Sequence, residues 1–105
     1  MLYLSNFRPK DERMTDYVAA QEAIKALKSV EPSSESESIL AACTGFSDRS
    51  IFDALMLLGY TIKERFISEG AILLQSADGS KALLGYRPPI GADINKSILM
   101  LELSA

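Results

Sequence analysis

The sequence contains no histidine and no tryptophan, and Cys43 is the one cysteine among its 105 residues. Without histidine, the chain lacks the most common general base at neutral pH and a principal metal ligand. Ser–His and Cys–His nucleophile pairs are excluded for the same reason. A structural zinc site needs about four Cys or His ligands, which a single cysteine cannot provide. We therefore expect no enzymatic activity, no metal and no cofactor, and we assign no catalytic residue.

The chain also lacks a long apolar run. Its apolar runs, such as residues 54–59 and 98–101, are short, whereas a membrane-spanning helix needs about 20 residues. Residues 1–7 are too few for the apolar part of a signal peptide, and charged residues follow them at once. A single cysteine excludes an internal disulfide, which is usual in reducing compartments. We expect a cytoplasmic protein without membrane contact.

An excess of basic residues is also missing, because eleven Lys and Arg stand against fourteen Asp and Glu, for a net charge of −3. Nucleic-acid binding draws most of its affinity from cations that neutralise phosphates, so the composition disfavours this function. A local basic patch stays open as an alternative. Its candidate nucleic-acid contacts are Arg8, Lys10, Arg13, Arg49, Lys63 and Arg65.

The length fits one domain that covers residues 1–105. Its first part has helical spacing, with an apolar face opposite a charged one. We predict a helix that begins between Pro9 and Thr15 and ends near Val30, because Pro32 disfavours helical backbone at the residue before it. The apolar positions of this helix are Tyr17, Ala20, Ile24 and Leu27.

Two further helices are predicted before the strands begin. Ser34 and Glu37 have the spacing of a capping box and predict a short helix over residues 39–44, which places Cys43 in its last turn as a buried, unreactive thiol. Ser47 is suited to begin the next helix and Gly59 to end it. Residues 51–58 leave almost no polar face, so we expect this helix to be buried on most sides. Its exception is Asp53, which we expect to lie on a single exposed seam or to form an ion pair with Arg49, with a catalytic carboxylate as the alternative.

The pattern then changes to a period of two, which is typical of strands. We predict strands over residues 60–66, 71–75, 81–87 and 97–103, with Asp78-Gly79 as a hairpin turn. A short strand within residues 1–7 is a further option. The expected fold class is α+β, with three N-terminal helices packed on a three- to four-stranded antiparallel sheet, in an arrangement that could be winged-helix-like.

Residues 39–60 resemble a helix-turn-helix, since alanines, Thr44-Gly45, a serine cap and an apolar helix ending in Leu58-Gly59-Tyr60 follow one another. With the hairpin at 78–79 in the position of a wing, residues 39–87 are similar to winged-helix domains. The resemblance implies a DNA-reading second helix. Its two acids outnumber its one arginine, and this excess of negative charge would repel phosphates. The exposed positions of the helix are Ser47, Asp48, Arg49, Ser50 and Asp53.

The last predicted strand is apolar on both of its sides, since Ile98-Leu99-Met100-Leu101 is an unbroken run. Such a strand is either central in its sheet or covered by another chain. The second option predicts a partner or a homodimer at the C-terminal strand. The candidate partner-binding residues are Ile98, Met100, Leu101 and Leu103.

These observations favour a non-enzymatic protein-binding module that acts as an inhibitor or adaptor through surface complementarity. Its general character, small and slightly acidic, is similar to that of phage-encoded inhibitors of host defence such as anti-CRISPR proteins. That resemblance implies another protein, or a nucleoprotein complex, as the partner. The alternative is a winged-helix nucleic-acid-binding transcriptional regulator. A hydrolase that uses carboxylates alone ranks third.

Overall fold

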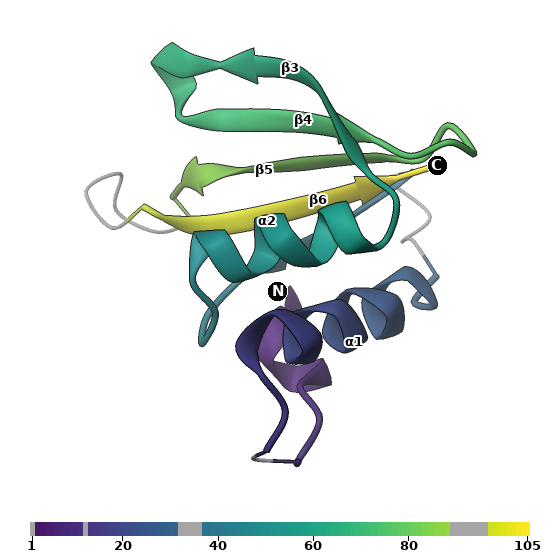
Figure 1. The fold of residues 1–105 in the computed structure, drawn as a ribbon. Coiled ribbons are helices and arrows are strands. Elements are labelled where there is room, and N and C mark those ends of the chain that lie inside the picture. The colour runs from purple at the N-terminus through teal and green to yellow at the C-terminus, as the bar shows by residue number, and fades with distance from the viewer. Residues whose placement is uncertain (1, 12, 32–36, 89–96) are drawn as a thin grey trace.

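The computed structural model describes residues 2–11, 13–31, 37–88 and 97–105. They form an α+β fold with two α-helices and a six-stranded mixed sheet (Figure 1). The helices are α1 (Asp16–Lys28) and α2 (Asp48–Leu57), and two 3-10 turns are η1 (Leu4–Phe7) and η2 (Ile67–Glu69). The strands are β1 (Leu2–Tyr3), β2 (Ser38–Ala42), β3 (Thr61–Phe66), β4 (Ala71–Gln75), β5 (Lys81–Arg87) and β6 (Ile98–Ser104). The prediction of three helices on a three- to four-stranded antiparallel sheet is therefore wrong.

The order of the strands in the sheet is β1-β2-β6-β5-β4-β3. From β3 to β6 the sheet is an antiparallel meander, as the sequence predicts, and Gly79 makes its hairpin turn at φ +91°. Beyond β6 the sheet continues with β2, which is antiparallel to β6, and with β1, which is parallel to β2. The added pair of strands places β6 near the middle of the sheet.

The predicted second helix is the strand β2. Residues 38–42 pair with β6, for example Ile39 with Leu103 and Ala41 with Leu101. This pairing joins segments about 60 residues apart, and such distant contacts override a local helical preference. Because the first helix of the helix-turn-helix resemblance is absent, that interpretation and the winged-helix-like arrangement are wrong. Ser34, the proposed cap, lies outside the described residues.

Helix α1 matches the prediction in position, and its buried side chains include Ala20, Ile24 and Leu27. Tyr17, which we placed on the same buried stripe, is 44% exposed. Helix α2 begins and ends as predicted. The Ser47 hydroxyl accepts a hydrogen bond from the backbone N–H of Ser50 at 3.1 Å, and Gly59 follows the helix at φ +96°.

The expectation that α2 is buried on most sides is wrong. Ile51, Ala54 and Leu55 are fully buried, whereas Met56 and Leu57 are 43% and 58% exposed. The helix packs with one side against α1 and the sheet, and its other side faces outward (Figure 1). The predicted ion pair within α2 is present, with 3.1 Å between Arg49 Nε and Asp53 Oδ1.

The core lies between the two helices and one face of the sheet, which we call the covered face. Alternate residues of the strands point to it, among them Leu74, Ala82 and Leu101, which are all 0% exposed. Residues of opposite alternation point to the other face of the sheet, which we call the open face because neither described helix packs on it (Figure 1). The open face includes Leu40, Leu73, Leu83, Gly85, Arg87, Ile98, Met100 and Glu102.

Candidate protein-binding surface

A groove of about 570 Å³ crosses the open face where β4 and β5 run side by side. Its floor consists of Ala71, Leu83 and Gly85. The register pairs Ala71 with Gly85, the two smallest side chains of this face, so the sheet surface is low at that point. A Cβ atom at position 85 would lie 2.7 Å from the Cβ of Ala71. Glycine is therefore required here by a close approach of the two strands.

Larger side chains stand around this floor. Phe66 and Glu69 come from β3 and the following turn, and Tyr86, Arg87 and Pro88 come from the end of β5. The antiparallel pairing of Ala71 with Gly85 places the turn before β4 next to the end of β5. Figure 1 shows the β3–β4 turn and the end of β5 on the same side of the molecule. Two large apolar residues nearby are exposed, Ile67 by 89% and Tyr86 by 52%. Tyr86 pairs with Leu99 and therefore has the alternation of the covered face.

Two charged residues of the open face form an ion pair, with 3.1 Å between Arg87 Nη2 and Glu102 Oε1. Their positions flank the Gly85–Met100 pair of β5 and β6 on the same face. The two long side chains therefore meet across Met100, which is 1% exposed although it points away from the helices. In the turn before β4, the Glu69 carboxylate accepts a hydrogen bond from the Ser68 hydroxyl at 2.7 Å.

The four predicted partner-binding residues separate onto the two faces. Leu101 and Leu103 point to the covered face and belong to the core, while Ile98 and Met100 point to the open face. Both edges of β6 are hydrogen-bonded, one to β2 and the other to β5. The first of the two sequence-based options, a central strand, is therefore the one observed. An added strand at β6, and a homodimer of that kind, has no edge to join.

The six predicted nucleic-acid contacts do not form one patch. Arg8 follows β1 at one edge of the sheet, whereas Lys63 and Arg65 lie on β3 at the other edge. Arg8 is bound to Asp16 at 2.9 Å, donates to the Gly45 carbonyl oxygen at 2.8 Å and covers the Phe46 ring.

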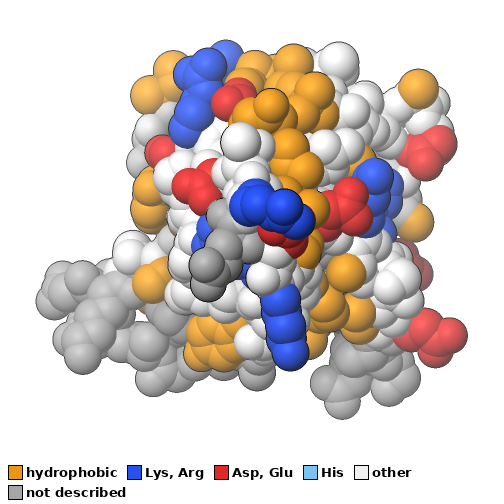
Figure 2. All heavy atoms as spheres, turned by 60° about the horizontal axis from the view of Figure 1, so that its bottom comes forward, with side chains coloured by type: hydrophobic (Ala, Val, Ile, Leu, Met, Phe, Trp, Pro, Cys, Tyr) orange, Lys and Arg blue, Asp and Glu red, His pale blue; other side chains and the backbone are white. Residues whose placement is uncertain are grey.

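Two more of these cations have acidic partners, because Arg13 pairs with Asp11 and Arg49 with Asp53. For Lys10, Lys63 and Arg65, the described part of the chain supplies no ion pair. Figure 2 shows Lys and Arg side chains interspersed with Asp and Glu on the face it presents. That face has no continuous positive field of the kind that phosphate binding draws on.

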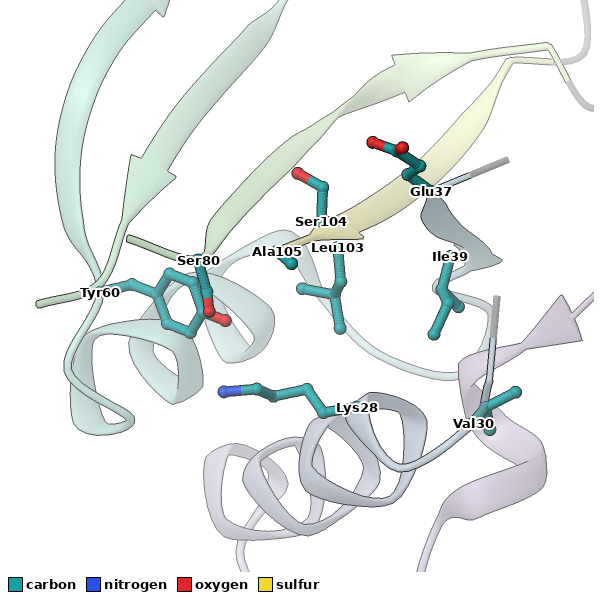
Figure 3. A pocket seen from close by; sticks show the side chains of 9 residues that line it. All are labelled: Lys28, Val30, Glu37, Ile39, Tyr60, Ser80, Leu103, Ser104 and Ala105. Atoms are coloured by element: carbon teal, nitrogen blue, oxygen red, sulfur yellow. The ribbon is translucent and has the colours of Figure 1, made fainter. Parts of the chain in front are cut away.

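A second, smaller cavity of about 250 Å³ lies between the end of α1 and the sheet (Figure 3). Val30, Ile39 and Leu103 supply its apolar lining, and Lys28 extends across it toward Tyr60. The Lys28 ammonium lies 5.3 Å from the centre of the Tyr60 ring, in a cation–π contact. Its volume is below the range of about 300–1,000 Å³ that is usual for ligand sites. We therefore interpret this contact as a packing feature that holds α1 against the sheet.

Cys43 is buried, as the sequence predicts, but it follows β2 and not a helix. Its backbone N–H donates to the Leu99 carbonyl oxygen at 2.8 Å, and the residue is 3% exposed. Burial raises the pKa of the Cys43 thiol to about 12, so the thiolate form is scarce at neutral pH. This thiol is therefore a poor nucleophile in the folded protein.

The acidic side chains of the described residues do not gather into a group of three that could hold a metal ion. The pKa of the Asp78 carboxyl is lowered to about 2, because the hydroxyl of Ser76 and the backbone N–H and hydroxyl of Ser80 donate hydrogen bonds to it. These bonds close the β4–β5 hairpin. Neither α1 nor α2 is long and apolar enough to cross a membrane, and no other described helix is.

The groove was missed by sequence reasoning, although one signal for it was present. A glycine inside a strand pattern, here Gly85, indicates a bulge or a close approach of another backbone. The large residues around the groove belong to two segments that lie about 20 positions apart in the sequence, and only the strand register brings these segments together. Comparisons with models of protein families, with curated proteins and with solved structures found no match to this chain.

Proposed function

We propose that this chain is a non-enzymatic protein-binding module, and that the open face of its sheet is the binding surface. It acts as an inhibitor or adaptor, by occupying a surface of its partner. The observation that supports the proposal most directly is the groove of about 570 Å³ with an apolar floor, next to the turn that carries the exposed Ile67. Contiguous exposed apolar surface of this kind is typical of protein–protein contacts.

The arrangement of charge on the open face also suits a protein partner. Glu69 and Arg87, the latter paired with Glu102, are the charged residues beside the apolar floor of the groove. An apolar centre with a polar rim is the usual anatomy of such interfaces. Nucleic acid is a weaker candidate, because the predicted cations lie at opposite edges of the sheet and half of them pair with acids.

The absence of catalytic chemistry is part of the same proposal. The sequence has no histidine, and burial raises the pKa of its one thiol to about 12. A cytoplasmic location also belongs to the proposal, since a single cysteine is typical of reducing compartments. The similarity in general character to phage-encoded inhibitors of host defence stays a prediction.

The proposal can be tested with a photo-crosslinking amino acid placed at position 83 in the groove floor and, as the control, at position 57 on α2. Both are leucines that reach the surface, but they belong to opposite sides of the sheet. We expect protein crosslinks from position 83 and far fewer from position 57. Equal yields from the two positions, or none from position 83, would contradict the open face as the binding surface.

A further inference from the structure

We propose that the cavity of about 250 Å³ at the end of α1 binds a small organic acid. The carboxylate of the ligand lies at Lys28 and Tyr60, and its short hydrocarbon chain lies against the sheet. Figure 3 shows the ends of these two side chains directed toward the same part of the cavity. The site is on the covered side of the sheet, so it is separate from the groove and does not depend on the proposed function.

The first support for the site is the hydroxyl group of Tyr60. This residue is 1% exposed, yet it lines the cavity. Among the described residues, none forms a hydrogen bond with its hydroxyl group. The phenol group of a buried tyrosine usually has a hydrogen-bond partner. The cavity is the space from which a ligand can supply one.

The second support is the ammonium group of Lys28, which lies 5.3 Å from the centre of the Tyr60 ring. The described part of the chain supplies no acid that pairs with it, whereas Lys25, three residues earlier, pairs with Glu22. The contact that holds α1 against the sheet therefore also fixes a cation whose N–H donors are not used in an ion pair. A carboxylate has two oxygens, so it can accept from the ammonium and from the tyrosine hydroxyl at once.

The size and lining of the cavity decide what the carboxylate is attached to. Val30, Ile39 and Leu103 form an apolar wall, and the last two are paired across β2 and β6. A hydrocarbon chain that covers this wall removes apolar surface from water. The volume is below the range that is usual for drug-sized ligands. The cavity therefore suits an acid with only a few carbon atoms.

Two acids near the cavity decide which way the ligand lies. Glu37 borders the cavity, and Figure 3 shows its carboxylate pointing away from Lys28. The pKa of Asp78 is lowered mainly by hydrogen bonds from Ser76 and Ser80 and less by the charge of Lys28, so this carboxylate has donors of its own. The negative end of the ligand therefore belongs at Lys28, away from Glu37.

The experiment titrates the full chain with sodium butyrate, with sodium chloride as the control for ionic strength. It follows the methyl NMR signals of the two valines in the sequence. Val30 lines the cavity, whereas Val18 lies near the start of α1. We expect a saturable shift of Val30 with a dissociation constant of about 1 mM, and none for Val18. No saturable shift of Val30 up to about 50 mM butyrate would overturn the inference, as would equal shifts of the two valines.

A comparison of ligands tests the chemistry of the site. Butyrate should bind about tenfold more tightly than acetate, because two more methylene groups leave water. The uncharged 1-butanol should bind about tenfold more weakly than butyrate, because it cannot form a charged contact with Lys28. Inorganic phosphate that binds as tightly as butyrate would overturn the inference, because the apolar wall would then contribute nothing.

Variants of the lining test the role of each residue. Lys28→Met should weaken butyrate binding about tenfold, and Lys28→Arg should retain most of the affinity. Tyr60→Phe keeps the ring and removes the hydroxyl, which should weaken binding about fivefold. Lys25→Met, the matched control on α1, and Glu37→Gln should not weaken it. Equal losses for Lys28→Met and Lys25→Met, in variants whose thermal unfolding shows an intact fold, would overturn the site, as would a loss for Glu37→Gln.

Discussion

The two faces of the sheet are made by the same strands but differ in what lies on them. On the covered face, Leu74, Ala82 and Leu101 are 0% exposed beneath the helices. On the open face, Leu73 and Leu83 keep part of their surface accessible, and Leu83 forms part of the floor of the groove. Apolar residues on the covered face stabilise the fold because folding removes their apolar surface from contact with water. On the open face, Leu73 and Leu83 remain partly in contact with water, although Met100 is 1% exposed.

The largest expected difference between the faces is in stability. Leu101→Ala removes a fully buried side chain of the covered face and should lower the free energy of unfolding by about 3 kcal/mol. Leu83→Ala removes the same atoms from the open face, where part of the side chain already contacts water, and should cost less than about 1 kcal/mol. Urea unfolding of both variants measures this, and equal losses would contradict the distinction between the faces.

The second prediction concerns the floor of the groove. Gly85→Ala should lower the free energy of unfolding by about 2 kcal/mol, because the new Cβ would lie 2.7 Å from the Cβ of Ala71. It should also weaken binding at the groove. The double variant Gly85→Ala with Ala71→Gly moves the methyl group across the strand pair and should recover part of the stability, because the Cα at position 71 and the Gly70 carbonyl oxygen would still lie 3.0 and 3.1 Å from the new Cβ. Thermal unfolding of the single and double variants checks the result; an equally unstable double variant would place the strain elsewhere.

The third prediction uses Cys43 as a probe of the covered side. Its folded pKa of about 12 lies above the ordinary value of 9.0, so the unfolded chain ionises first as the pH rises. The stability from this group is present below about pH 9 and is lost as the pH approaches the folded pKa, by about 1 kcal/mol near pH 10. Comparing the pH dependence of unfolding with that of Cys43→Ala isolates this contribution. Identical slopes would show that water reaches the thiol in the folded protein.

The smallest effect is expected for the Arg87–Glu102 pair. Glu102→Gln should change the free energy of unfolding by less than about 1 kcal/mol, because both side chains are about one-third exposed and solvent screens their attraction. The matched variant Ile39→Val lies on the covered face and loses one methylene group, and it should cost about 1 kcal/mol. Chemical denaturation of the two proteins compares them. A larger loss for Glu102→Gln would mean that the open face is more protected from water than its side chains indicate.

Local patterns were sufficient for much of the fold. The capped helix at residues 48–57, the turn at Gly79 and the meander that follows were predicted from residues close together in the chain. The segment 39–43 was not, because four or five apolar residues fit a buried strand as well as a helix. Its partner strand lies about 60 positions away, and nothing in the segment itself names that partner.

The candidate site was predicted only in part. The apolar run 98–101 correctly indicated a strand with both sides buried. The sequence did not decide whether this strand is central in its sheet or covered by another chain, because that depends on which strands pair with it. Leu101 and Leu103 proved to be core residues, while Ile98 and Met100 are on the open face. Phe66, Gly85 and Arg87 form the groove through strand register, which depends on pairing and not on local sequence.

The central claim, that the open face is where this chain binds protein, is tested most directly by comparing photo-crosslinking from position 83 in the groove floor with photo-crosslinking from position 57 on α2. We expect protein crosslinks from position 83 and far fewer from position 57. Equal yields from the two positions, or none from position 83, would contradict the account.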